Sequence, residues 1–163
     1  MNTSRLHRAV RITDRGFTLV ELLAALMIAS ILSAVAVPMY MGYTKDARLA
    51  EGKAIAGATL KALQGCVQPR VPGSSCDLTD INHRIGVDSS GTTGDGRWTV
   101  TTASLTLNST SPATMTGTVG VVGVAGHETN GIGLGLYVSP TGAFLRCDQS
   151  SNVVPASNGG NPC

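Results

Sequence analysis

Residues 17–41 read FTLVELLAALMIASILSAVAVPMYM, and this stretch decides the fold. From Leu22 to Met41, twenty consecutive residues carry no charge. A helix of that length is about 30 Å long, which is the thickness of the hydrocarbon core of a bilayer. A buried helix of a globular protein can be equally apolar, but here arginines flank one side and polar, cysteine-containing sequence flanks the other. We therefore expect a membrane-spanning helix.

Charge is divided unevenly around this stretch. The 163 residues carry a formal net charge of +2, of which the first sixteen contribute +3 and the remainder −1. The first sixteen contain one acidic residue, Asp14, and four basic ones, Arg5, Arg8, Arg11 and Arg15. Arginines ahead of a span predict a cytoplasmic N-terminus, with the C-terminal part outside the cytoplasm. The small net charge argues against a nucleic-acid binder built on a basic surface. The 42% hydrophobic content excludes a disordered chain.

The N-terminal block differs from an ordinary secretory signal. Its apolar segment is about twice the usual length, and no small-x-small cleavage site closes it. This favours cleavage before the apolar segment, which then stays as a permanent anchor. Glu21 is the one carboxylate in the apolar stretch that starts at Phe17, and a carboxylate in hydrocarbon costs on the order of 3 kcal/mol. If the chain is cut after Gly16, the new ammonium of Phe17 can be neutralised by Glu21 of the same chain or of a neighbour.

The segment Gly16-Phe-Thr-Leu-Val-Glu21 with its apolar helix resembles the class III signal of type IV prepilins. The likeness continues through Pro38, Tyr40, Tyr43 and the stretch 47–51, as in the first helix of type IVa pilins. It implies that a prepilin peptidase cuts after Gly16 and methylates Phe17, that Glu21 supports assembly, and that the helix kinks or loosens at Pro38. The sixteen-residue leader is longer than many in that family, and the sequence of residues 22–27 is not the one most common in the first helix of that family.

The helix is expected to run from Phe17 to about Gln64, which is roughly 70 Å at the standard rise. Pro38 removes a backbone donor and clashes with the preceding turn, and Gly42 weakens the next turn, so a kink or local break is expected there. An ordinary transmembrane proline without a mechanical role is the alternative. In residues 44–64 the pattern is amphipathic, which predicts that one face packs on a sheet. The apolar positions are Ala47, Ala50, Ala54, Ala58 and Ala62, flanked by Ile55, Leu60 and Leu63.

The remaining sequence predicts loops and short strands. Residues 66–96 are rich in proline and glycine and predict a long connecting loop. Strands are predicted at 97–107, 114–124, 134–138 and 143–147, with turns at 108–112 and 139–142. The expected fold is therefore α+β: a long N-terminal helix, transmembrane in its first half, on an antiparallel sheet of about four strands within 97–147. The expected parts are a leader at 1–16, a membrane helix at 17–43 and an extracytoplasmic, pilin-like head at 44–163.

Four cysteines outside the membrane favour two disulfides in an oxidising compartment. Three pairings are open. Cys66–Cys76 and Cys147–Cys163 are favoured because each closes a short loop, and the second bounds a tail, 147–163, that resembles the disulfide-bounded loop near the C-terminus of the family. A zinc site is the alternative, but the spacings lack a close metal-binding pair, and His83 and His127 have no helical partner. No metal or cofactor is expected.

No constellation predicts catalysis. The glycines between Gly117 and Gly135 lack the strand, tight turn and helix of a phosphate loop, so packing explains them better. The histidines are isolated, and His7 would leave with the leader. Asn108-Ser-Thr has the spelling of a glycosylation site and is interpreted as a turn.

The leading hypothesis is a structural one, a type IV pilin precursor. It would be a single-pass inner-membrane protein that joins copies of itself in a surface filament, with the prepilin peptidase and the inner-membrane assembly machinery as further partners. Adhesion, twitching motility and DNA uptake are functions of such filaments. The alternatives are a pseudopilin of a type II secretion system and a DNA-binding minor competence pilin. DNA binding finds no support, since residues 44–163 hold eight basic and eight acidic side chains.

Overall fold

A computed structural model describes residues 17–109 and 113–163. The predicted leader, with Gly16 and His7, lies outside the described residues, and so does part of the turn predicted at 108–112. The chain divides into two compact units, Met1–Tyr43 and Thr44–Cys163, which are described separately. The second unit is called the head.

One helix, α1 (Leu19–Val67), supplies the described part of the first unit apart from Phe17 and Thr18, and it continues into the head. It is the one helix among the described residues that is long and apolar enough to cross a membrane, and its most apolar window is not buried at all. The α-helix is continuous through Pro38 and Gly42. Of the kink or local break expected there, the kink at Pro38 stays a prediction.

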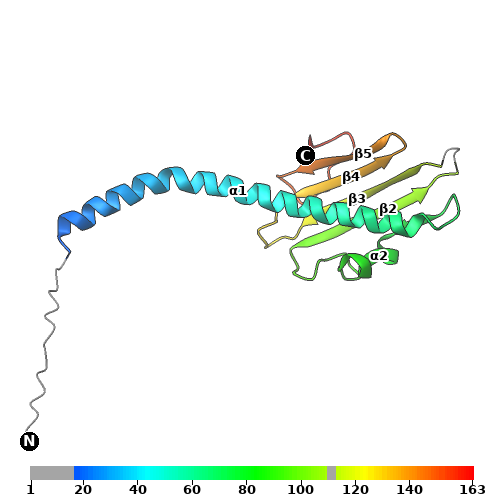
Figure 1. Ribbon diagram of the computed structural model, residues 1–163, viewed down its shortest axis with the longest axis horizontal. Coiled ribbons are helices and arrows are strands. Elements are labelled where there is room, and N and C mark those ends of the chain that lie inside the picture. Colours follow the sequence, from blue (N-terminus) through cyan, green and yellow to red (C-terminus); the bar gives the residue numbers. More distant parts are fainter. Residues whose placement is uncertain (1–16, 110–112) are drawn as a thin grey trace, which may run out of the picture. The chain divides into compact units, whose positions relative to one another are not determined.

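In the head, α1 lies along one face of an antiparallel sheet (Figure 1). The buried residues recur every three or four positions: Leu49, Gly52, Ala56, Thr59, Leu63 and Val67. A helix that packs one face on the sheet was expected, but the buried face is not the one that carries the alanines at helical spacing, here called the alanine face. Ala47, Ala50, Ala54 and Ala58 are exposed. Glycine and threonine are weak hydrophobic signals, yet Thr59 is tolerated in the core because its hydroxyl donates to the carbonyl of Ile55 at 2.8 Å.

The sheet has six strands in sequence order, each antiparallel to the next. They are β1 (Ser75–Asp77), β2 (Trp98–Leu107), β3 (Met115–Gly123), β4 (Gly133–Ser139), β5 (Gly142–Asp148) and β6 (Asn161–Pro162). The predicted strands correspond to β2–β5, and the expectation of about four is corrected by the two short edge strands. Strands of two or three residues carry too little pattern of their own and form through their neighbours.

The core lies between α1 and the inner face of the sheet. Trp98, Val100 and Leu105 of β2 and Val119 and Val121 of β3 are fully buried or nearly so. Side chains alternate between the two faces of a strand, so their neighbours in sequence point to the outer face. On β2, for example, Ala103 lies on the inner face and is the cross-strand partner of Val119. The next residue, Ser104, lies on the outer face and is the cross-strand partner of Thr118.

The prediction of loop throughout 66–96 is wrong. Besides β1, this segment holds helix α2 (Leu78–Ile85). Asp77 caps the helix by accepting from the backbone of Thr79, and Asp80 accepts in return from the backbone of Asp77 at 3.0 Å. Gly86 ends the helix with a φ of 70°, a conformation that glycine adopts without strain.

The segment 149–160, here called the strap, lies against the outer face of β3 and β4. A Cβ on Gly120 would lie 2.6 Å from Cγ2 of Val154, and one on Gly133 would collide with the carbonyl of Val153. The hydroxyl of Tyr137 donates to the carbonyl of Pro155. Glycines in β3 and β4 thus let a second layer of backbone approach the sheet, which is a packing role rather than a phosphate loop.

Candidate functional site

Helix α1 begins with a reciprocal capping box formed by Thr18 and Glu21. Oε2 of Glu21 accepts from the backbone nitrogen and the hydroxyl of Thr18, at 3.0 and 2.9 Å. The hydroxyl of Thr18 accepts from the backbone nitrogen of Glu21 at 3.3 Å. Two donors that would be left unpaired at a helix start are satisfied in this way. Thr18 was not singled out from the sequence, although the spacing Thr-x-x-Glu is the signature of such a box.

In the capping box, only one of the two carboxylate oxygens of Glu21 accepts hydrogen bonds. All its hydrogen bonds within residues 17–109 and 113–163 go to Oε2, so Oε1 is available to another partner. The side chain of Phe17, just ahead of the box, is 83% exposed. Phe17 thus lies two residues before α1, and Glu21 lies in the first turn of that helix.

The first unit presents apolar side chains outward all along the helix. Every described residue from Phe17 to Tyr43 is exposed, including leucines, isoleucines, valines and both tyrosines. Such a surface needs lipid or other protein around it, because an apolar patch of this extent is unstable in water. Pro38 and Gly42 lie within this surface.

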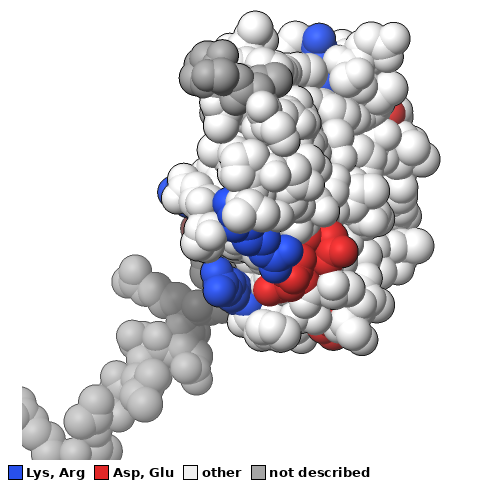
Figure 2. Space-filling model, turned by 90° about the vertical axis from the view of Figure 1, so that its right-hand side faces the viewer, with Lys and Arg blue, Asp and Glu red and all other residues white. Residues whose placement is uncertain are grey.

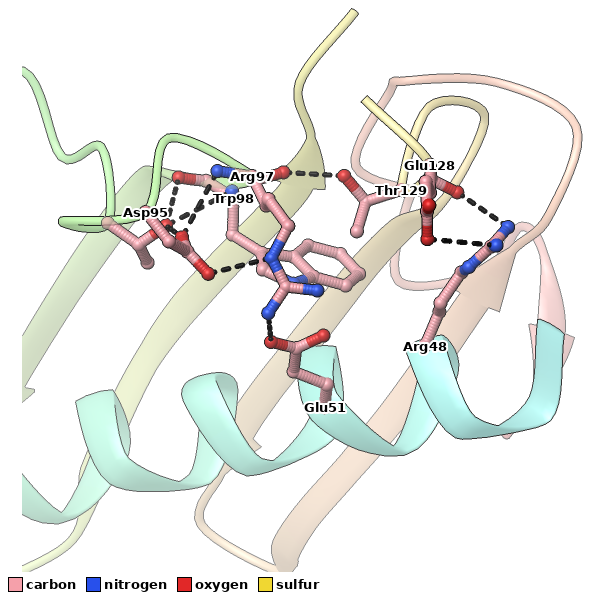
Figure 3. Close-up of polar contacts among 8 residues, drawn as sticks. Arg48, Glu51, Asp95, Arg97, Trp98, Glu128 and Thr129 are labelled. Carbon is pink, nitrogen blue, oxygen red and sulfur yellow. Dashed lines mark hydrogen bonds and ion pairs between the residues drawn. The ribbon is translucent and has the colours of Figure 1, made fainter. Parts of the chain in front are cut away.

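Ion pairs connect the first turns of α1 within the head to the sheet and its loops (Figure 3). The part of α1 from Thr44 to Val67 is called the head helix. Arg97, just before β2, donates to Glu51 of α1 at 2.6 Å and to Asp95 at 2.7 Å. Arg48 of α1 donates to the carboxylate of Glu128 at 3.1 Å and to its backbone carbonyl at 2.9 Å. These groups are partly exposed, so each pair adds little to stability, but together they fix the register of the helix on the sheet.

The electrostatics of this network are strongest at Asp95. The hydroxyl of Thr93, and next the guanidinium of Arg97, lower the pKa of Asp95 to about 2. The hydrogen bond to Asp95 and the charge of Glu51 raise the pKa of Arg97. The buried hydroxyl of Thr129 donates to the carbonyl of Arg97 at 2.6 Å, which holds the loop before β4 to the same point.

Two disulfides fasten the irregular parts of the head. Cys66–Cys76 joins the end of α1 to β1, and Cys147–Cys163 joins β5 to the end of the tail. These are the pairs that the sequence favours. The first disulfide lies near the carboxylate of Asp80, but both sulfurs are bonded to each other and the carboxylate pairs with Arg70 at 2.9 Å. The cluster therefore offers no thiolate to a metal.

The other residues considered from the sequence are scattered. His83 lies in α2, and His127 lies between β3 and β4. Figure 2 shows one end of the head, where most of the surface carries no charge and the largest group of basic side chains in view adjoins acidic ones. This face offers no broad basic patch to a polyanion.

Comparison with known protein families identifies a motif at the N-terminus of the chain. Residues 12–37 match the family of the prokaryotic N-terminal methylation motif. No solved structure matches the chain. The match covers the predicted cleavage region and most of the apolar segment, and the antiparallel head is that of an α+β, pilin-like fold. Residues 12–37 thus carry the N-terminal methylation motif, which is the class III signal peptide of type IV pilins.

Proposed function

We propose that this protein is a structural subunit of a type IV pilus, made as an inner-membrane precursor with a cytoplasmic N-terminus and assembled into a surface filament. One observation carries the proposal: the methylation motif leads directly into α1, whose apolar residues are exposed from Phe17 to Tyr43. A bilayer covers such a helix before assembly, and neighbouring helices cover it in a filament core.

Processing is proposed to occur between Gly16 and Phe17, followed by methylation of Phe17. The cut removes the leader with its four arginines and changes the net charge from +2 to −1. It also creates an ammonium beside the capping box. The free oxygen of Glu21 is proposed to accept this ammonium from an adjacent subunit, which lowers the cost of both charges in an apolar core.

The exposed alanine face of the head helix supports assembly in a second way. Ala47, Ala50, Ala54 and Ala58 form a surface without large side chains on the side of α1 that faces away from the sheet. Small side chains allow the backbones of neighbouring subunits to approach closely.

The proposal is tested by the intact mass and the N-terminal residue of protein sheared from the cell surface. The expected result is a chain that begins at methylated Phe17, with both disulfides formed, in long filaments. Gly16→Glu should abolish the cut, and an unchanged mature mass in that variant would contradict the assigned site. If deletion stops the secretion of an enzyme and no long filaments exist, the protein is a secretion pseudopilin instead.

The two roles of Glu21 can be separated by variants. Glu21→Gln keeps the capping box, since Gln serves at this position, but removes the charge. Thr18→Ala keeps the charge and removes the cap, at a cost of about 1 kcal/mol. We expect Glu21→Gln to be processed normally but to yield at least tenfold fewer filaments, while Thr18→Ala still assembles. If Glu21→Gln assembles normally and Thr18→Ala does not, capping rather than ion pairing explains Glu21.

A further inference from the structure

A row of side chains crosses the outer face of the sheet beside the strap. Ser104 pairs with Thr118, Thr118 with Tyr137, and Tyr137 with Phe144, so one residue from each of β2–β5 stands side by side. Neighbouring strands are about 4.8 Å apart, so this row is about 14 Å long. The residues one position along, Ala103, Val119, Leu136 and Leu145, form the parallel row of the inner face. The four outward residues are called the outer row.

Two aromatic rings form one end of the outer row. The rings of Tyr137 and Phe144 are stacked, with centroids 5.4 Å apart and planes at 23°. Phe144 is 40% exposed, so this aromatic surface faces solvent. Ser104 and Thr118 form the other end, and neither hydroxyl has a hydrogen-bond partner among the residues that the structure describes.

An unpaired arginine lies beside the rings. The guanidinium carbon of Arg146 is 5.8 Å from the ring centroid of Phe144. Arg48, Arg70 and Arg97 each pair with a carboxylate. Arg146 makes no hydrogen bond or ion pair within the described part of the chain, and its Nε is buried without a partner. A guanidinium beside an aromatic ring, with no acid of its own, is suited to an anionic group of a ligand.

The strap bounds the outer row on one side. It covers the glycines of β3 and β4 next to the row, and its Pro155 carbonyl accepts from the hydroxyl of Tyr137. The ring of Tyr137 leans toward Gly135, where a Cβ would lie 2.8 Å from its Cε2. The result is a ledge whose floor is the outer row and whose wall is the strap.

We propose that this ledge binds an acidic saccharide. The C–H face of a sugar ring packs on an exposed aromatic ring such as Phe144, and the hydroxyls of Ser104 and Thr118 exchange hydrogen bonds with those of the sugar. Arg146 pairs with a carboxylate or sulfate of the saccharide. A nucleic acid is disfavoured, because the head holds eight basic and eight acidic residues and the ledge holds a single cation. The proposal does not depend on filament assembly.

The test uses the full chain in detergent micelles and isothermal titration calorimetry. The probes are a sulfated heparin tetrasaccharide, a carboxylated hyaluronan tetrasaccharide, uncharged maltotetraose and oligo-dT of matched charge. We expect at least one acidic saccharide to bind at least tenfold more tightly than maltotetraose and oligo-dT. Comparison of the first two probes shows whether sulfate or carboxylate is preferred.

Variants then locate the site. Arg146→Gln should weaken binding of the acidic saccharide at least tenfold, since hydrogen bonds to charged groups are among the stronger ones. Arg84→Gln, which removes an exposed arginine of α2, is the matched control and should leave affinity unchanged. Phe144→Thr should weaken binding, and Phe144→Tyr should retain it. Fluorescence of Trp98, the only tryptophan, verifies that each variant is folded.

Several outcomes would overturn the proposal. They are absence of binding to both acidic saccharides, equal affinity for maltotetraose, tighter binding of oligo-dT, and an equal loss in Arg146→Gln and Arg84→Gln. Because the assay is performed in micelles, a protein that binds the saccharide but forms no filament refutes only the proposed pilus role. A protein that forms filaments but does not bind refutes only the ledge.

Discussion

Gly52 offers a sharp test of how α1 packs on the sheet. Glycine in a helix is normally a weakness, and replacement by alanine stabilises by about 0.5–1 kcal/mol. At Gly52, however, a Cβ would lie 2.6 Å from Cδ1 of Leu134 and 2.8 Å from Cη2 of Trp98. Both side chains are fully buried, so neither can move aside without disturbing the core. We expect Gly52→Ala to destabilise the head.

Gly57 provides the matched control. It lies five residues further along the same helix, and a Cβ there would have nothing within 4 Å. Overpacking a core costs about 1–3 kcal/mol. Subtracting the helix-propensity gain of about 0.5–1 kcal/mol from a mid-range overpacking cost of about 2 kcal/mol leaves Gly52→Ala about 1–1.5 kcal/mol less stable than wild type. Gly57→Ala should be about 0.5–1 kcal/mol more stable.

Thermal unfolding of the full chain in micelles, followed by the fluorescence of Trp98, measures both effects in the head. For a head of this size the shifts correspond to a fall in Tm of roughly 3–8 °C for Gly52→Ala and a rise of roughly 2–4 °C for Gly57→Ala. Adding Leu134→Val to Gly52→Ala removes one of the colliding methyl groups and should restore part of the loss. If Gly52→Ala were as stable as Gly57→Ala, the close contact of α1 with Trp98 would be refuted.

Three further variants test the network, the strap and the tail. The pKa of Asp95 is lower in the folded than in the unfolded state, so its contribution to the free energy of unfolding is present above about pH 4 and is lost as the pH falls toward 2. In Asp95→Asn, the free energy of unfolding should therefore fall less steeply between pH 4 and pH 2 than in the wild type. Gly133→Ala should displace Val153 and make the strap exchange its amide hydrogens faster, and unchanged exchange would contradict the close approach. Replacing Cys147 and Cys163 by serine opens a loop with a sequence separation of 16, which should cost about 3 kcal/mol in denaturant unfolding.

Local patterns were sufficient for some elements and not for others. The membrane-length helix and β2–β5 were predicted because long apolar runs and alternating strands are encoded locally. The alanine face was the wrong guide to the buried side of α1, because alanine is tolerated both in a core and on a surface. The buried side instead includes Gly52, chosen for space, and Thr59, which satisfies its own hydroxyl within the helix.

Other features had a local signal that was overlooked. Thr18 with Glu21, and Asp77 with Asp80, have the spacing of a capping box, and the second pair marks the start of a helix in a segment predicted as loop. Edge strands β1 and β6 have no such signal. They form only because β2 and β5 present unpaired backbone groups beside them.

The sequence alone thus determined the N-terminal motif, the length of the apolar helix, the α+β class and a favoured pair of disulfides, since each depends on spacing along the chain. Only the tertiary structure decided which side of α1 is buried, how Arg97 links Glu51 to Asp95, and why glycines line β3 and β4 beneath the strap. It also brought Tyr137, Phe144 and Arg146 together on one face. These features depend on the register between strands and on the space between layers, which are properties of contacts between distant residues rather than of any one segment.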